Sequence, residues 1–141
     1  MKEIIIFPAM LMLLISCSMS EKNANNEAKI SQSKAEDFNS FFAKFCNDST
    51  FQVSKITFPL ALISENDDSK TKKTIPLKEW IHTNLLRLNK DNPKNILDIK
   101  KIKGNSIEVI FSIEDSGVIV IHLFSKINNK WYLTKITDES D

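Results

Sequence analysis

The C-terminal part of the chain carries the pattern that most restricts its fold. Runs rich in β-branched and aromatic residues follow one another at 96–103, 106–113, 118–126 and 130–137. Residues that favour turns separate them at 104–105, 114–117 and 128–129. Because such short turns join neighbouring strands that run in opposite directions, the sequence predicts an antiparallel meander.

One of these strands has an apolar residue at almost every position. Residues 118–124 are apolar on both faces of the strand, with His122 as the exception. A strand of this kind lies in the middle of a sheet with both of its faces covered. The outer cover is either another part of the chain or a second copy, so a homodimer through the sheet face is one expectation.

A stripe of phenylalanines predicts a helix before the sheet. The members of the stripe recur at i, i+3, i+4 and i+7: Phe38, Phe41, Phe42 and Phe45. This spacing places them on one face of a helix, which needs a concave apolar partner. Ser33 and Glu36 have the spacing of a capping box, so we expect the helix over 34–46.

The middle of the chain predicts shorter elements. One helical turn is expected over 51–55, capped by Asp48, followed by an extended segment over 56–63. Proline cannot donate to a strand ladder, so Pro59 places that segment at a sheet edge or at a bulge. A short strand near 71–75 and a second helical segment follow. The apolar face of that helix would consist of Leu77, Trp80, Ile81, Leu85 and Leu88.

The first residues have the layout of a secretory signal. One cation, Lys2, precedes an apolar run that ends at Ser16 and is shorter than the ~20 residues of a transmembrane helix. The sequence Leu14-Ile15-Ser16-Cys17 resembles the lipobox of bacterial lipoproteins. The resemblance implies cleavage before Cys17 and a lipid on that cysteine.

This organisation divides the chain into three parts. We expect a signal peptide at 1–16, a lipidated polar tether at 17–33 and a single folded domain at 34–141. The alternative is an ordinary signal peptide or a retained anchor, in which Cys17 is incidental. Ser18 is not the aspartate that retains many such lipoproteins at the inner membrane, so the outer membrane is the expected location.

Two stretches carry a family resemblance. The stretch at 51–60 has the pattern Phe-Gln-x-Ser-Lys-Ile-x-Phe-Pro-Leu, and the closing strand contains Trp-Tyr-Leu-Thr-Lys-Ile at 131–136. With the phenylalanine helix, they resemble uncharacterised Bacteroidota-type lipoproteins that have a nuclear transport factor 2-like, or cystatin-like, domain. The resemblance covers 36–138 and implies an α+β fold, in which a curved antiparallel sheet wraps the N-terminal helix.

Such a fold leaves a cone-shaped cavity, which is a common kind of ligand site. The residues expected to line it are Phe38, Phe42, Trp80 and His122. Enzymes on this fold, such as ketosteroid isomerase and small dehydratases, place an acid or a histidine in the cavity. His122 is the candidate acid or base for that alternative.

Charge and cysteine content restrict the other functions. The net charge is +1 with a single arginine, Arg87, whereas duplex-binding domains concentrate Lys and Arg on one face. If Cys17 is acylated, Cys46 is the remaining thiol, and His82 and His122 lie far apart in the sequence. We therefore expect no nucleic acid, metal, cofactor or internal disulfide.

These features favour a membrane-anchored envelope lipoprotein. We expect its domain to bind a small molecule or an envelope protein without catalysis. The alternative is a small enzyme of the isomerase or dehydratase type that uses an acid or base in the cavity.

Overall fold

A phenylalanine in the middle of the sheet is the centre of the core. In the computed structural model, which describes residues 35–66 and 69–141, the ring of Phe124 on β5 (Ile119–Ile127) is fully buried against helix α1 (Phe38–Asn47). The phenylalanine rings of α1 surround it edge to face, with centroids 5.2 to 5.9 Å from its own: Phe38, Phe41, Phe42 and Phe45. The predicted stripe therefore finds its apolar partner on the sheet.

Helix α1 begins later than the sequence predicted. Its N-cap is Asp37, whose carboxylate accepts a hydrogen bond from the backbone N–H of Ser40 at 2.9 Å. The capping box predicted for Glu36 is wrong, because the carboxylate of Glu36 accepts the backbone N–H of Trp131 instead. Ser33 lies outside the described residues.

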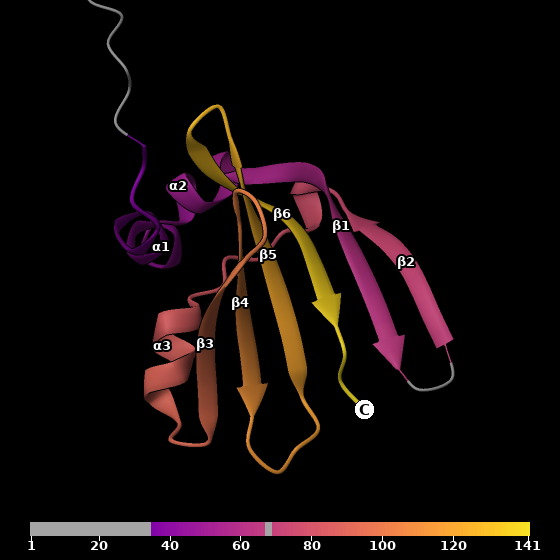
Figure 1. Ribbon diagram of the computed structural model, residues 1–141. Helices are drawn as coiled ribbons and strands as arrows, with labels where there is room; N and C mark the ends of the chain where they lie inside the picture. The colour runs from indigo at the N-terminus through magenta and orange to yellow at the C-terminus, as the bar shows by residue number, and fades with distance from the viewer. Residues whose placement is uncertain (1–34, 67–68) are drawn as a thin grey trace, which may run out of the picture. The chain divides into compact units, whose positions relative to one another are not determined.

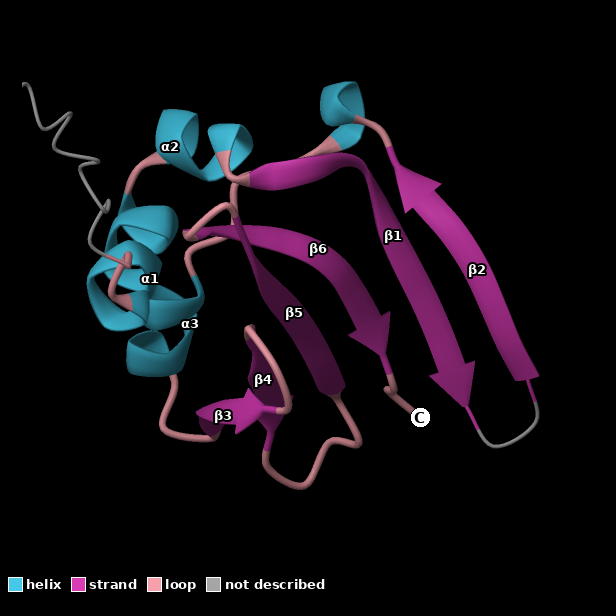
Figure 2. Cartoon of the chain, turned by 45° about the horizontal axis from the view of Figure 1, so that its top comes forward, coloured by secondary structure: helices cyan, strands magenta, loops and turns pink. Residues whose placement is uncertain are grey.

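Within the described residues the strands form one sheet in the order β2-β1-β6-β5-β4-β3. The other strand bounds are β1 (Ile56–Asn66), β2 (Ser69–Ile75), β3 (Asn95–Ile102), β4 (Ser106–Ile113) and β6 (Lys130–Asp138). Strands β3 to β6 pair antiparallel with their neighbours in chain order, which confirms the predicted meander. Figures 1 and 2 show α1, α2 and α3 gathered at one side of this sheet, while the β1–β2 hairpin extends away from them.

The tight turn between β5 and β6 follows the sequence signal. Asn128 and Asn129 both have positive φ angles, 49° and 62°, as a two-residue hairpin turn of this kind requires. Asparagine tolerates this region better than most residues because its short side chain bonds locally. The turn therefore fixes the pairing of Ile127 with Lys130.

The sequence analysis expected an antiparallel sheet, but one pair of strands is parallel. Strand β1 pairs antiparallel with β2 but parallel with β6. Alternation of apolar residues decides which face of a strand is buried, but it does not decide the direction of the neighbouring strand. Because β1 pairs in parallel with the last strand of the meander, β6, the sheet is mixed.

Pro59 lies at an irregularity of β1. The pairing of β1 with β6 shifts register between Ile56 and Ala61, and pairing with β2 begins only at Leu60. The expected bulge is therefore confirmed. Of the two alternatives, an edge or a bulge, the structure has the bulge, and β1 as a whole lies between β2 and β6.

The second predicted helix is broken into two short pieces. A 3₁₀ turn, η1 (Leu77–Glu79), is separated by extended residues from α3 (Leu85–Asp91). Leu85 is buried, but Ile81 is 80% exposed, so the predicted apolar face does not form. Asn84 accepts the N–H of Arg87 and starts α3, a helix N-cap that the sequence analysis did not use.

A buried glutamine explains why the segment between these pieces is extended. Gln52 lies on the predicted helical turn, α2 (Ser49–Ser54), which Asp48 caps. Its amide nitrogen donates to the carbonyls of Phe45 and Thr83, at 3.0 and 2.8 Å. Its amide oxygen accepts from Trp80 Nε1 at 3.0 Å and from the backbone N–H of Thr83 at 3.2 Å. These bonds hold Trp80 and Thr83 against α2 in place of a helical turn.

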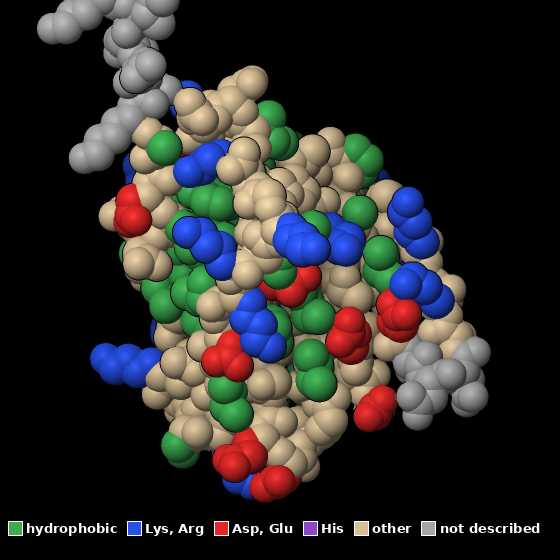
Figure 3. Space-filling model, in the orientation of Figure 1, with side chains coloured by type: hydrophobic (Ala, Val, Ile, Leu, Met, Phe, Trp, Pro, Cys, Tyr) green, Lys and Arg blue, Asp and Glu red, His purple; other side chains and the backbone are tan. Residues whose placement is uncertain are grey.

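The outer face of β5 remains partly open. Ile119 is 37% exposed and Ile127 is 44% exposed, while Ile121 and Leu123 are half-buried. The homodimer expected through this face stays a prediction. On the face shown in Figure 3, hydrophobic side chains lie between Lys, Arg, Asp and Glu side chains of both signs.

The N-terminal predictions concern residues outside the described part. The signal peptide at 1–16, the lipidation site Cys17 and the tether up to residue 33 all fall there. Among the described residues, no helix is long and apolar enough to cross a membrane.

Replacing the central ring should cost most of the stability of the core. The Phe124→Ala variant should lose about 3–5 kcal/mol of unfolding free energy, because it leaves a cavity among rings that cannot collapse around it. Equilibrium unfolding in urea measures this loss. The matched control is Ile127→Ala on the same strand, where the side chain is 44% exposed and the change should stay within about 0.5 kcal/mol. Similar losses in both variants would contradict the central role of Phe124.

Candidate functional site

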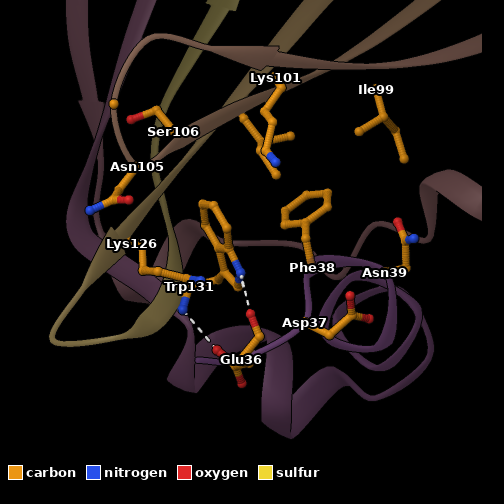
Figure 4. Close-up of a pocket in the computed structure, with 12 residues that line it drawn as sticks. Glu36, Asp37, Phe38, Asn39, Ile99, Lys101, Asn105, Ser106, Lys126 and Trp131 are labelled. Atoms are coloured by element: carbon orange, nitrogen blue, oxygen red, sulfur yellow. Dashed lines mark hydrogen bonds between the residues drawn. The ribbon is translucent and has the colours of Figure 1, made fainter. Parts of the chain in front are cut away.

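A cavity in the described part of the chain lies beside the start of α1. It has a volume of about 470 Å³ and is bounded by residues 36–39, by the β3–β4 hairpin and by the β5–β6 hairpin. Figure 4 shows these segments converging on the rings of Phe38 and Trp131. We call this cavity the groove.

The floor of the groove is aromatic. The rings of Phe38 and Trp131 meet edge to face, with centroids 5.1 Å apart and planes at 76°. Both side chains are more than nine-tenths buried, and buried Ile107 lies beside them. Ile99 on β3 also lines the groove, but 46% of it is exposed. Most of the apolar surface that the fold leaves open in the lining therefore belongs to Ile99, and the two rings add little more.

Glu36 connects Trp131 on the floor of the groove to the segment before α1. Its carboxylate accepts the backbone N–H of Trp131 at 2.8 Å, and its carbonyl accepts the indole Nε1–H of Trp131 at 3.0 Å, as Figure 4 shows. The backbone N–H of Glu36 donates to the carbonyl of Asn129 at 3.4 Å. These bonds join the residues before α1 to the β5–β6 hairpin and fix the orientation of the indole.

Two lysine side chains also line the groove. Lys101 extends from β3 towards the two rings, and Lys126 lies beside Trp131 at the end of β5 (Figure 4). The ammonium of Lys126 is 4.7 Å from the centroid of the Trp131 ring, within the range of a cation–π contact. Hydrogen bonds from the backbone and hydroxyl of Ser40 lower the pKa of Asp37 at the helix end of the groove, so this carboxylate is ionised at neutral pH.

The turn that closes the groove depends on one glycine. Gly104 joins β3 to β4 with φ at +81°, a conformation that glycine adopts without strain. The turn brings Asn105 and Ser106 to the lining. Their amide and hydroxyl groups add hydrogen-bonding capacity beside the aromatic floor.

The structure does not bring the predicted cavity residues together. Phe38 lines the groove, but Phe42 is 2% exposed and packs within the core. Trp80 lines a second, shallower cavity with His82 and residues of α2. His122 is not among the lining residues of these two cavities or of a third one at the ends of β1 and β2. The space between α1 and the sheet is filled by phenylalanine rings.

His122 lies on the inner face of the sheet in an apolar setting. It pairs with Val109 on β4 and Ile136 on β6, and it is 8% exposed. Desolvation lowers the pKa of His122 from 6.5 to about 4, although the backbone of Val109 and Val120 opposes this shift. Its Nδ1 has no hydrogen-bond partner within the described residues. His122 is therefore a neutral core residue at physiological pH.

Sequence reasoning missed the residues that make the groove. Glu36, Lys101, Lys126 and Trp131 come from segments that are far apart in the chain, and no spacing in the sequence links them. The available signal was the Gly-Asn turn at 104–105, which predicts a hairpin end but not what faces it. Among the described residues, no group of three or more His, Cys, Asp or Glu is arranged to hold a metal ion.

Several solved structures similar to this domain come from Bacteroides species. An NTF2-like protein from Bacteroides fragilis superposes with a TM-score of 0.57 at 20% identity, over 77% of this chain and 49% of that one. A cystatin-like protein from Bacteroides caccae gives 0.52 at 23% identity, over 74% and 77% of the two chains. A protein from Bacteroides uniformis gives 0.50 at 24% identity, over 74% and 77%. The chain thus spans about half of the first protein's length.

A protein-family model described as "-like" matches residues 36–140, which is most of the chain. The chain belongs to that family. Its fold is nuclear transport factor 2-like, or cystatin-like, with helices packed on a curved, unclosed sheet. No curated protein matches the chain. This NTF2-like domain agrees with the fold that the sequence resemblance implied.

The buried histidine predicts how the NTF2-like domain responds to acid. The unfolded chain binds a proton at His122 below pH 6.5, whereas the folded chain resists protonation until about pH 4. Proton binding at His122 thus has little effect on stability above pH 6.5, and about 3 kcal/mol of stability is lost as the pH falls from 6.5 to 4. The His122→Leu variant should lack this part of the loss in urea unfolding measured across that range.

The matched control for this experiment is His82→Gln. The His82 side chain is exposed, and its Nε2 lies 3.1 Å from the carbonyl oxygen of Cys46. This variant should keep the pH dependence of the unchanged protein. If His122→Leu and the unchanged protein lose the same stability between pH 6.5 and 4, the buried neutral state of His122 is wrong.

Proposed function

We propose that this NTF2-like domain is a non-catalytic binding module whose ligand occupies the groove. The observation that carries the proposal is the groove itself, a concave space of about 470 Å³ with an aromatic floor and polar groups at its mouth. Ligand sites typically have volumes of about 300–1,000 Å³, and the volume of the groove falls in this range. The fastening of Trp131 by Glu36 supports a preformed site, because it fixes the floor before any ligand arrives.

The surroundings of His122 support a non-catalytic role. A general acid or base must reach the proton that it transfers, directly or through one water. His122 is nine-tenths buried among apolar strand neighbours and lies outside the lining of the groove. The groove carboxylates, Glu36 and Asp37, each accept a backbone N–H and so have structural partners already.

We also propose that the protein is anchored in the outer membrane through lipid on Cys17. The sequence Leu14-Ile15-Ser16-Cys17 supports this step, and the polar stretch up to residue 33 would serve as the tether. Each buried methylene contributes ~0.8 kcal/mol to membrane binding, so two or more acyl chains give durable anchoring. The groove would then work close to a membrane surface, with an envelope molecule as its ligand.

Filling the groove should weaken ligand binding without unfolding the domain. The Ile99→Trp variant adds a large side chain at a lining position that is 46% exposed, so it should block the groove at little cost in stability. A ligand-observed NMR screen of small fragments against the full-length protein in lipid nanodiscs measures binding. Fragments that bind the unchanged protein should bind Ile99→Trp about tenfold more weakly.

The matched control is Ile96→Trp. Ile96 lies on the same strand, is 42% exposed, and faces the other side of the sheet outside the groove. This variant should bind the fragments as tightly as the unchanged protein does. Binding that survives Ile99→Trp, or a screen in which no fragment binds, would contradict the groove as the site.

Lipidation predicts a difference between the two cysteines. In the native host, the unchanged protein and Cys46→Ala should incorporate labelled palmitate, whereas Cys17→Ser should incorporate none. Cys46 is a suitable control because its side chain is fully buried and burial raises the pKa of its thiol. Intact mass spectrometry should place the acyl groups on a chain that begins at Cys17. Label on the Cys17→Ser chain would contradict the anchor.

A further inference from the structure

We propose that the groove takes a small organic anion: a single carboxylate held between Lys101 and Lys126, with an apolar body against Phe38, Trp131 and Ile99. This inference rests on the proposed function and names the class of its ligand. Lys101 and Lys126 reach the groove from different strands, β3 and β5: Lys101 extends towards the rings from the strand side, and Lys126 lies beside Trp131 (Figure 4). Both lysines line the groove, so their ammonium groups can donate to one carboxylate bound there.

Neither lysine forms an ion pair in the described part of the chain, although the charge of Lys126 contributes to lowering the pKa of Asp37. The ion pairs between described side chains are Lys70 with Glu65 and Arg87 with Asp91, which lie elsewhere. Lys101 is exposed and takes part in neither pair. Lys126 is half-buried and is positioned by the ring of Trp131 rather than by a carboxylate. An incoming anion therefore meets two ammonium groups that no protein carboxylate contacts.

The acids of the groove limit how much negative charge a ligand can carry. Glu36 and Asp37 lie on the helix side of the rings in Figure 4, each bonded to a backbone N–H. Asp37 stays ionised because its hydrogen bonds lower its pKa. A second anionic group on the helix side of the ligand would face these carboxylates and be repelled. The arrangement therefore selects one anionic group on the strand side and disfavours polyanions such as nucleotides.

The remaining lining selects the body of the ligand. Phe38, Trp131 and Ile107 give an apolar floor, and Ile99 leaves nearly half of its surface uncovered beside them. An apolar or aromatic body of moderate size covers that surface and removes it from water. The groove volume of about 470 Å³ accommodates such a molecule rather than a single ion.

The test compares para-fluorophenylacetate with its neutral amide, para-fluorophenylacetamide. Fluorine NMR of each probe is recorded with the full-length protein in lipid nanodiscs, and empty nanodiscs give the background from the membrane. The protein should bind the acetate at least about tenfold more tightly than the amide, a difference of about 1.4 kcal/mol. The fluorine signal of the acetate should therefore broaden and shift at lower probe concentrations than that of the amide. Raising the salt concentration should weaken the acetate more than the amide.

The variants separate the charge from the shape of the site. Lys101→Gln and Lys126→Gln should each weaken the acetate several-fold and leave the amide unchanged. The matched controls are Lys100→Gln and Lys130→Gln, neighbours that are exposed and lie outside the lining, and they should bind both probes as the unchanged protein does.

The two proposals fail in different ways. If the amide binds as well as the acetate and both are lost in Ile99→Trp, the anion is wrong but the groove remains a ligand site. If Lys100→Gln weakens the acetate as much as Lys101→Gln, the preference is a general surface charge effect and the anion site is wrong. If neither probe binds and no fragment binds the groove, both the anion and the binding function are wrong.

Discussion

The contact between α1 and Phe124 is the interaction on which the rest of the domain depends. A meander of four strands buries one face only if something apolar covers it, and the phenylalanine stripe of α1 does so ring by ring. Each edge-to-face pair adds directional preference to the apolar area that it buries. The contact therefore sets where α1 lies on the sheet and in which rotation.

The groove follows from that placement. Once Phe38 is held against Phe124, its ring also meets Trp131, and the start of α1 comes to face the ends of the β3–β4 and β5–β6 hairpins. Glu36 then bonds to Trp131 instead of capping its own helix. The cavity that the fold was expected to leave in its interior is filled by rings, and the open space lies at the rim.

Much of the fold could be predicted because its signals are local. The strand runs from Asn95 to Asp138 are separated by turns with glycine or asparagine, and the stripe in α1 has one clear period. The parallel pairing of β1 with β6 could not be predicted, since alternation carries no direction. The second predicted helix is interrupted where Gln52, distant in sequence, bonds to both the carbonyl and the N–H of Thr83.

The site was less predictable than the fold for a physical reason. Lys101 and Lys126 look like solvated lysines in the sequence, and only the pairing of β3, β4 and β5 places both in the lining of one cavity beside α1. A register irregularity between Leu123 and Phe124 also changes which residues of β6 face inward, so that Leu133 and Ile136 are both buried. His122 and Trp80, which the sequence analysis nominated for the cavity, lie away from the groove.

The most direct measurement is the position of a bound probe within the protein. Fluorine–proton Overhauser effects from bound para-fluorophenylacetate identify the protons that lie within a few ångströms of its ring. This account predicts effects to the indole of Trp131, the ring of Phe38 and the methyl groups of Ile99. Effects confined to Trp80 and Val53 in the second cavity, or to the outer face of β5, would contradict the groove as the binding site.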